Sequence, residues 1–169
     1  MKGFFSKCSN IIYLDFSNFN YSNAKDLKNM FYDCTNLKEI KGINKIITNN
    51  ATNISGMFQK CSELEYIDLF NSDTSNVTDM SWMFDQCEKL TEIKGINNFN
   101  TKKVKDMKGM FKKCYELEYL NLSNFDISNV NDMTFMFNKC LKLKEIKGLN
   151  RFVTNNEAII NVKLQESKK

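Results

Sequence analysis

Three things are missing from this sequence of 169 residues: proline, histidine and any long apolar run. Because proline kinks regular structure and lacks a backbone N–H, its absence suits a regular stack of repeated elements. Without histidine, a mixed Cys/His metal site is excluded, and acid–base catalysis would fall to carboxylates or lysine. No apolar stretch approaches the roughly 20 residues that cross a bilayer. The N-terminus, MKGFFSKCSN, also lacks the apolar stretch of a signal peptide.

Charge of one sign is not concentrated anywhere either. The 24 basic and 20 acidic residues are spread along the chain and leave a net charge of +4. Because no basic block is present, nothing indicates a nucleic-acid partner. Hydrophobic residues make up 42% of the chain, which is enough for a continuous core. The composition therefore predicts a folded chain without a transmembrane segment.

The six cysteines mark a repeat that covers most of the chain. They lie alternately 26 and 27 residues apart, and each ends a similar phrase: KGFFSKC, KNMFYDC, SGMFQKC, SWMFDQC, KGMFKKC and TFMFNKC. One repeat, called a rung below, cannot bury its own apolar edge, so the rungs must stack. We therefore predict a single solenoid over residues 1–164, with about six rungs of which the first is incomplete. A polar tail is expected at 165–169.

Each rung is predicted to hold one short strand and one short helix. Residues 64–70 alternate between inward and outward positions, with Leu64, Ile67 and Leu69 inward, as in a strand. After a polar turn, apolar residues recur at the spacing of one helix face: Val77, Met80, Phe84 and Cys87. The expected fold class is thus α/β, a solenoid of parallel strands and short helices. The repeat length falls in the range of about 20–29 residues that is typical of leucine-rich repeats.

The alternating interval makes a pair of rungs, 53 residues long, the true repeat unit. Even rungs carry one extra residue, and the sequence leaves two placements open. In the first, Gly42, Gly95 or Gly148 forms a bulge after the strand, and the following apolar residue takes the inward slot. In the second, the extra residue lies in the turn beyond the recurring asparagine.

That asparagine recurs in every rung, seven residues after the first strand position. It is a candidate for a buried amide that bonds the backbone of neighbouring rungs, because a buried amide must be satisfied. On this interpretation, Asn71→Ala destabilises the fold more than the neighbouring change Ser72→Ala. The column is Asn18, Asn44, Asn71, Asn97, Asn124 and Asn150.

Longer phrases resemble a known family. NVTDMSWMFDQC, LEYIDLFNSDTSNVTDM and LEYLNLSNFDISNVNDM are similar to the BspA-like leucine-rich repeats of surface proteins in mycoplasmas, other bacteria and some protists. The resemblance runs from Met1 to about Phe152. It implies a surface-exposed solenoid used in adhesion or partner binding, and it brings no catalytic residues.

The cysteines themselves are expected to be structural. Their spacing is unlike that of metal ligands, and each lies on the inward stripe, where a free thiol behaves as a small hydrophobic group. We predict a reduced, buried ladder; disulfides between adjacent rungs are the alternative. The Met-Phe phrases are interpreted as core, with no metal and no cofactor. Because every candidate catalytic group recurs rung by rung, we expect no enzyme activity.

The outward strand positions carry the one surface signal in the sequence. If the strands are parallel and in register, neighbouring strands lie about 4.8 Å apart and acidic and basic side chains alternate along the sheet. Asp–Lys pairs then fix the register, while the tyrosines, which favour interfaces, are candidate contacts for a protein or cell-surface ligand. An intracellular scaffold is the alternative role. The candidate residues, expected on a concave face, are Tyr13, Glu39, Lys41, Tyr66, Asp68, Glu92, Lys94, Tyr119, Asn121, Glu145 and Lys147, with Asp15 in the same column.

Overall fold

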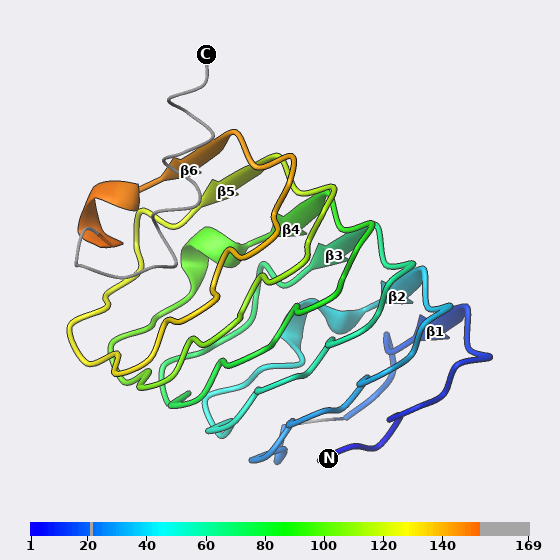
Figure 1. The fold of residues 1–169 in the computed structure, drawn as a ribbon. Coiled ribbons are helices and arrows are strands. Elements are labelled where there is room, and N and C mark those ends of the chain that lie inside the picture. Colours follow the sequence, from blue (N-terminus) through cyan, green and yellow to red (C-terminus); the bar gives the residue numbers. More distant parts are fainter. Residues whose placement is uncertain (21, 153–169) are drawn as a thin grey trace.

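The chain winds into a stack of flat rungs, each with one short strand along the same edge (Figure 1). This computed structural model describes residues 1–20 and 22–152. Every strand is three residues long, because only three positions per rung alternate before the chain turns. The strands are β1 (Tyr13–Asp15), β2 (Glu39–Lys41), β3 (Tyr66–Asp68), β4 (Glu92–Lys94), β5 (Tyr119–Asn121) and β6 (Glu145–Lys147).

The predicted parallel register is confirmed within pairs of strands. Tyr13 pairs with Glu39 and Asp15 with Lys41, and the same alignment recurs between β3 and β4 and between β5 and β6. Each pair links an odd rung to the even rung that follows. The pair of rungs is therefore the structural unit, as the 53-residue period predicts.

A continuous sheet, however, does not form. The six strands make three separate two-stranded sheets, with no hydrogen-bonded pairing of β2 to β3 or of β4 to β5 in the described residues. Each gap follows an even strand, where the extra residue of the even rung lies. The chain there leaves the strand through a short helix.

The glycines of the even rungs do not form the expected bulge within a strand; each one precedes a short helix. Gly42 and Gly95 have positive φ angles of 72° and 84° and lead directly into the 3₁₀ helices η1 (Ile43–Lys45) and η2 (Ile96–Asn98). The third such helix is η3 (Leu149–Phe152). A Cβ on Gly95 would lie 2.3 Å from the Cα of Phe70 in the preceding rung, so only glycine fits. Ile43 and Ile96, which follow these glycines, are buried, as Leu69 is in an odd rung.

The predicted helix on the opposite edge is wrong. The described residues contain no α-helix; the segment from Val77 to Cys87 is a series of tight turns. Trp82 and Gln86 have φ angles of 58° and 63°, which an α-helix excludes. The apolar residues of the segment are nonetheless buried, because turns that advance three or four residues give the same inward spacing as a helix.

Hydrogen bonds between rungs replace those of the missing helix. Every second N–H donates to a carbonyl of the next rung, as Met80 does to Asp106 and Phe84 to Met110, both at 2.9 Å. The intervening N–H groups close turns within the rung, such as that of Met83 to Met80. This turn face, made by residues 26–34, 53–61, 79–87, 106–114 and 132–140, is bonded at every junction between its segments. Hydrogen bonding between rungs is therefore continuous on the turn face, whereas on the strand side it is interrupted after every second strand.

Identical side chains stack along the length of the core. The phenylalanine rings lie nearly parallel, with centroids 5.4 to 5.8 Å apart, in the order Phe5, Phe31, Phe58, Phe84, Phe111 and Phe137. The Met-Phe phrases are core, as predicted: Met30, Met57, Met83, Met110 and Met136 are all buried beside the rings.

The cysteines form the expected ladder, with one exception. All six are free thiols, and those from Cys34 to Cys140 are buried, whereas Cys8 is only half-buried. Each buried thiol donates to the carbonyl of a phenylalanine in the preceding rung; the Sγ of Cys87 lies 3.0 Å from the oxygen of Phe58. Cys8, in the first described rung, departs from the predicted burial.

The asparagine column is not buried, which corrects the sequence interpretation. Asn18, Asn71 and Asn124 are exposed, and what lies inside the turn is the neighbouring Ser72. Asn124 does bond the backbone of the preceding rung, through Nδ2 to the oxygen of Asn97, but it does so at the surface. The expected order of the alanine changes at Asn71 and Ser72 is therefore reversed.

Threonines make the buried bonds between rungs instead. Thr74 is 1% exposed; its hydroxyl donates to the carbonyl of Asn100 at 3.0 Å and accepts from the N–H of the same residue at 2.8 Å. Thr101 repeats this arrangement with Asp126. The side chain of Asn150 and the predicted end of the solenoid, including the tail at 165–169, lie outside the described residues.

Candidate functional site

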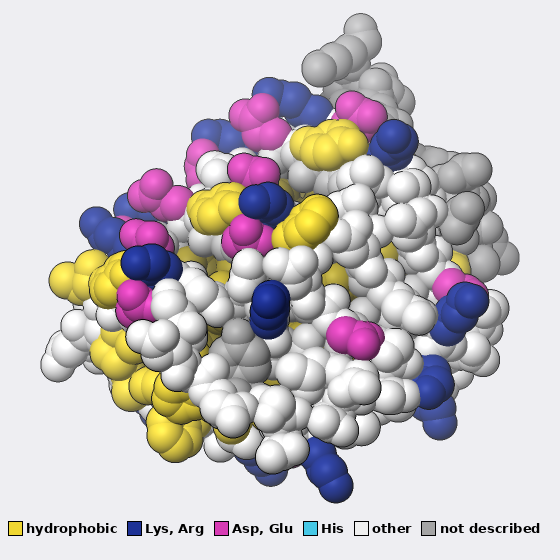
Figure 2. Space-filling view, turned by 180° about the vertical axis from the view of Figure 1, so that it is seen from behind, with side chains coloured by type: hydrophobic (Ala, Val, Ile, Leu, Met, Phe, Trp, Pro, Cys, Tyr) yellow, Lys and Arg dark blue, Asp and Glu magenta, His cyan; other side chains and the backbone are white. Residues whose placement is uncertain are grey.

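The outward side chains of the six strands form one exposed surface, called the strand face below. The rings of Tyr13, Tyr66 and Tyr119 are 49%, 42% and 48% exposed. Glutamates occupy the same column on the intervening strands, and all of them are exposed. From behind (Figure 2), hydrophobic, basic and acidic side chains alternate along the row of strands.

The next outward column holds the predicted Asp–Lys pairs. Lys94 lies 3.1 Å from Asp68, and Lys41 lies 3.6 Å from Asp15. The hydrogen bond to Asp68 raises the pKa of Lys94, and the hydrogen bonds of Ser17 lower the pKa of Asp15. The structure thus brings the predicted residues together two by two, within each pair of strands. It does not join the pairs across the gaps.

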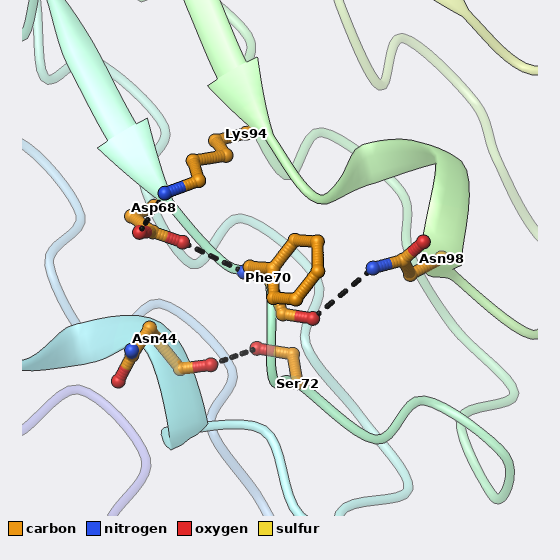
Figure 3. A network of polar contacts seen from close by, with 6 residues as sticks. All are labelled: Asn44, Asp68, Phe70, Ser72, Lys94 and Asn98. Atoms are coloured by element: carbon orange, nitrogen blue, oxygen red, sulfur yellow. Dashed lines mark hydrogen bonds and ion pairs between the residues drawn. The ribbon is translucent and has the colours of Figure 1, made fainter.

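Phe70 was not among the predicted site residues; it lies just after the end of β3, beside this column. Its backbone is fixed from two sides: its N–H donates to Asp68 at 2.9 Å, and its carbonyl accepts from Asn98 at 3.2 Å (Figure 3). The ring is 51% exposed, and the Nζ of Lys94 lies 5.9 Å from its centroid. The sequence did contain a signal for this residue: Phe70 departs from the repeat, since the same position in the other odd rungs holds Ser17 and Ser123.

The gaps in the sheet are clefts on this face. The cleft between β4 and β5 has a volume of about 420 Å³ and is lined by Phe70, Tyr119 and the backbone that follows Lys94. The equivalent cleft between β2 and β3 measures about 160 Å³. Equivalent junctions between the 53-residue units therefore differ in the shape that they offer to a partner.

A search of curated proteins finds no match to the chain. Among solved structures, a leucine-rich repeat protein of T. pallidum is 18% identical over 93% of this chain and 77% of its own, with a TM-score of 0.47. One from Bacteroides ovatus is 17% identical over 87% of this chain and 40% of its own, with a TM-score of 0.46. The profile of a family described as "Mycoplasma protein of unknown function, DUF285" matches residues 1–93 and 52–169. The chain belongs to this family.

The turn face of this DUF285 chain carries a second set of departures from the repeat. The Nζ of Lys112 lies 5.2 Å from the ring centroid of Trp82 and 5.8 Å from that of Phe135. Where Trp82 packs, the next rung has Gly109, whose Cβ would meet the indole at 2.2 Å. Large and small residues thus alternate in this column, which again makes two rungs the unit.

Among the described residues, no group of three or more histidine, cysteine or acidic side chains is placed to hold a metal ion. No helix in the same part of the chain is long and apolar enough to span a bilayer. The candidate site of this DUF285 chain is accordingly the strand face with its clefts.

Proposed function

We propose that the chain is a non-catalytic protein-interaction or adhesion module of a surface-exposed repeat protein, and that it binds its partner through the strand face. The observation that carries the proposal is the row of tyrosines, half-exposed on every second strand of a rigid stack. Tyrosine offers a large contact area at a low entropic cost and is enriched among the residues that dominate binding energy.

The phrases that resemble BspA-like repeats support the surface and adhesion parts of this role. The solenoid supports the interaction part, because stacked repeats present an extended surface on which neighbouring side chains keep fixed positions. Along the strands, Lys41 is paired with Asp15 and Lys94 with Asp68. They therefore contribute to the orientation and rate of association more than to affinity.

The test replaces Tyr13, Tyr66 and Tyr119 together with serine and measures binding to intact cells or to a candidate matrix protein. We expect binding to be abolished while circular dichroism shows an unchanged fold, because these side chains lie outside the core. Replacing Lys41, Lys94 and Lys147 should weaken binding less, with the larger effect at low salt.

A matched control removes three exposed apolar side chains elsewhere: Phe4→Ser, Phe135→Ser and Leu141→Ser. This variant should bind as the unchanged chain does. Undiminished binding by the folded tyrosine variant would move the functional surface away from the strand face.

An intracellular scaffold is the second candidate, and the six free thiols favour it, because reduced cysteines are typical of a reducing compartment. Limited proteolysis of intact cells separates the two roles. Rapid loss of the protein supports the surface role, and full protection supports the intracellular one.

A further inference from the structure

We propose that a groove across the third, fourth and fifth rungs binds a basic segment of a protein partner. The proposal names the partner chemistry of the interaction role given above and rests on that role. Two adjoining clefts make the groove. The first is the β4–β5 cleft of about 420 Å³, and the second, of about 460 Å³, lies where the chain enters these strands. Both are lined by Thr91, so they adjoin one another.

The aromatic part of the groove comes from three rings. Tyr115 lines the second cleft, and Tyr119 and Phe70 line the first. Such rings accept the ammonium or guanidinium groups of lysine and arginine against their faces and also pack on the apolar stems of those side chains. A basic peptide thus finds contacts for both ends of its side chains.

The acidic part of the groove comes from Glu65, Glu88 and Glu92, whose carboxylates have no ion pair in the described part of the chain. The nearby cations, by contrast, are each paired with another acid. Lys89 lies 2.8 Å from Glu63, and Lys94 lies 3.1 Å from Asp68. The groove therefore has an excess of negative charge on a protein whose net charge is +4.

This combination occurs once in the compared repeat units. At the positions 53 residues earlier, Glu65 is replaced by Ile12, Glu88 by Thr35 and Tyr115 by Ser62. Phe70 and Thr91 correspond to Ser17 and Lys38, and the equivalent strand cleft is the smaller one of about 160 Å³. A structural role common to all rungs does not require these changes, whereas a binding site for a cationic partner does.

The backbone beneath the groove is fixed before any partner arrives. The N–H of Thr91 donates to the carbonyl of Glu65 at 2.9 Å, and its hydroxyl donates to the same oxygen at 2.9 Å. The N–H of Glu116 donates to the carbonyl of Glu88 at 3.2 Å. Because the acids are carried by backbone that is already bonded, little order has to be gained on binding.

The test measures, by fluorescence anisotropy at low salt, the binding of a labelled peptide of alternating lysine and serine to the whole chain. A peptide with glutamate in place of lysine is the probe control. The groove variant is Glu65→Gln, Glu88→Gln and Glu92→Gln. The matched control variant removes the same charge from acids outside both the groove and the strand face: Asp26→Asn, Asp33→Asn and Asp73→Asn.

We expect the groove variant to raise the Kd for the lysine peptide about tenfold and the control variant to leave it nearly unchanged. Tyr115→Ser should weaken binding by a smaller factor, at high salt as well as at low salt. Equal losses in both charge variants, or equal binding of the glutamate peptide, would refute the groove. Two outcomes separate the groove from the strand-face role. If the variant with serine at 13, 66 and 119 loses cell binding but the unchanged chain does not bind the lysine peptide, only the groove is refuted. If the unchanged chain binds the lysine peptide but this variant keeps its cell binding, only the strand-face role is refuted.

Discussion

Single residues in this solenoid are selected by what the neighbouring rung places against them. Cysteine fits its column because the thiol is small, apolar and still able to donate to the phenylalanine carbonyl of the rung before it. Burial raises the pKa of Cys34 to about 11 and that of Cys140 to about 12, and it raises the pKa values of Cys61, Cys87 and Cys114 well above the ordinary value.

A pH dependence of stability follows from these thiols. Above the ordinary thiol pKa of 9.0 the unfolded chain loses protons that the folded chain keeps, so the free energy of unfolding should fall as pH rises from 9.0 toward the folded values. The slope is about 1.4 kcal/mol per pH unit for each such thiol. Urea melts between neutral and alkaline pH measure it.

The control for this prediction is a variant with Cys61 and Cys87 changed to alanine, which should show a shallower slope. A thiol reagent should label Cys8 first in the native protein and reach six thiols only after denaturation. Fewer than six in the denatured chain without reductant would mean that disulfides are present.

At the scale of elements, an acidic column on the turn face joins the rungs where a helix was predicted. Asp26, Asn53, Asp79, Asp106 and Asp132 pair in parallel with one another from rung to rung. In each of them Oδ1 accepts the N–H of the residue two positions later. Burial raises the pKa of Asp106, and the nearby carboxylates of Asp79 and Asp132 raise it further. The column therefore gains hydrogen bonds at the expense of some charge repulsion.

Two changes at Asp79 separate these effects. Asp79→Ala removes the acceptor for the N–H and hydroxyl of Ser81, at 3.0 and 2.7 Å, and should destabilise the fold by about 1–3 kcal/mol. Asp79→Asn should cost much less, because Asn53 makes the same two bonds to Ser55. Denaturant melts of both variants measure the loss in the free energy of unfolding. An equal loss in the two variants would show that the charge of Asp79, and not its hydrogen-bond acceptor, stabilises the column.

For the whole molecule, stability should depend on position along the stack. In a solenoid each rung contacts only its neighbours, so a central defect breaks two interfaces and a terminal one breaks a single interface. Phe84 packs between Phe58 and Phe111, whereas Phe5 has a stacked neighbour on one side, Phe31, and is only half-buried.

We expect Phe84→Ala to cost about 3–5 kcal/mol and Phe5→Ala clearly less. Calorimetry and chemical denaturation measure the difference. The milder pair Phe84→Leu and Phe5→Leu keeps the comparison available if the central alanine variant does not fold. Equal losses of unfolding free energy at the two positions would mean that stability does not depend on how many neighbouring rungs a phenylalanine contacts.

The period of the sequence by itself determined the stack, the strands, their register within pairs and the buried columns. These features depend on which residues recur at 26 and 27 positions, and apolar recurrence requires burial in any arrangement of stacked rungs. The outward positions of Tyr66, Asp68 and Lys94 follow from the same two-residue alternation, so most of the candidate face was also predictable.

Only the tertiary structure decided the rest. The spacing of Val77, Met80, Phe84 and Cys87 fits both a helix and a run of turns, and the turns prevail because their N–H groups bond the next rung. Likewise, Asn71 recurs in every rung and Ser72 does not, yet the path of the backbone puts the serine inside. The groove that Phe70 lines depends on the gap between β4 and β5. This gap forms only where two rungs meet, so the sequence of a single rung does not predict it.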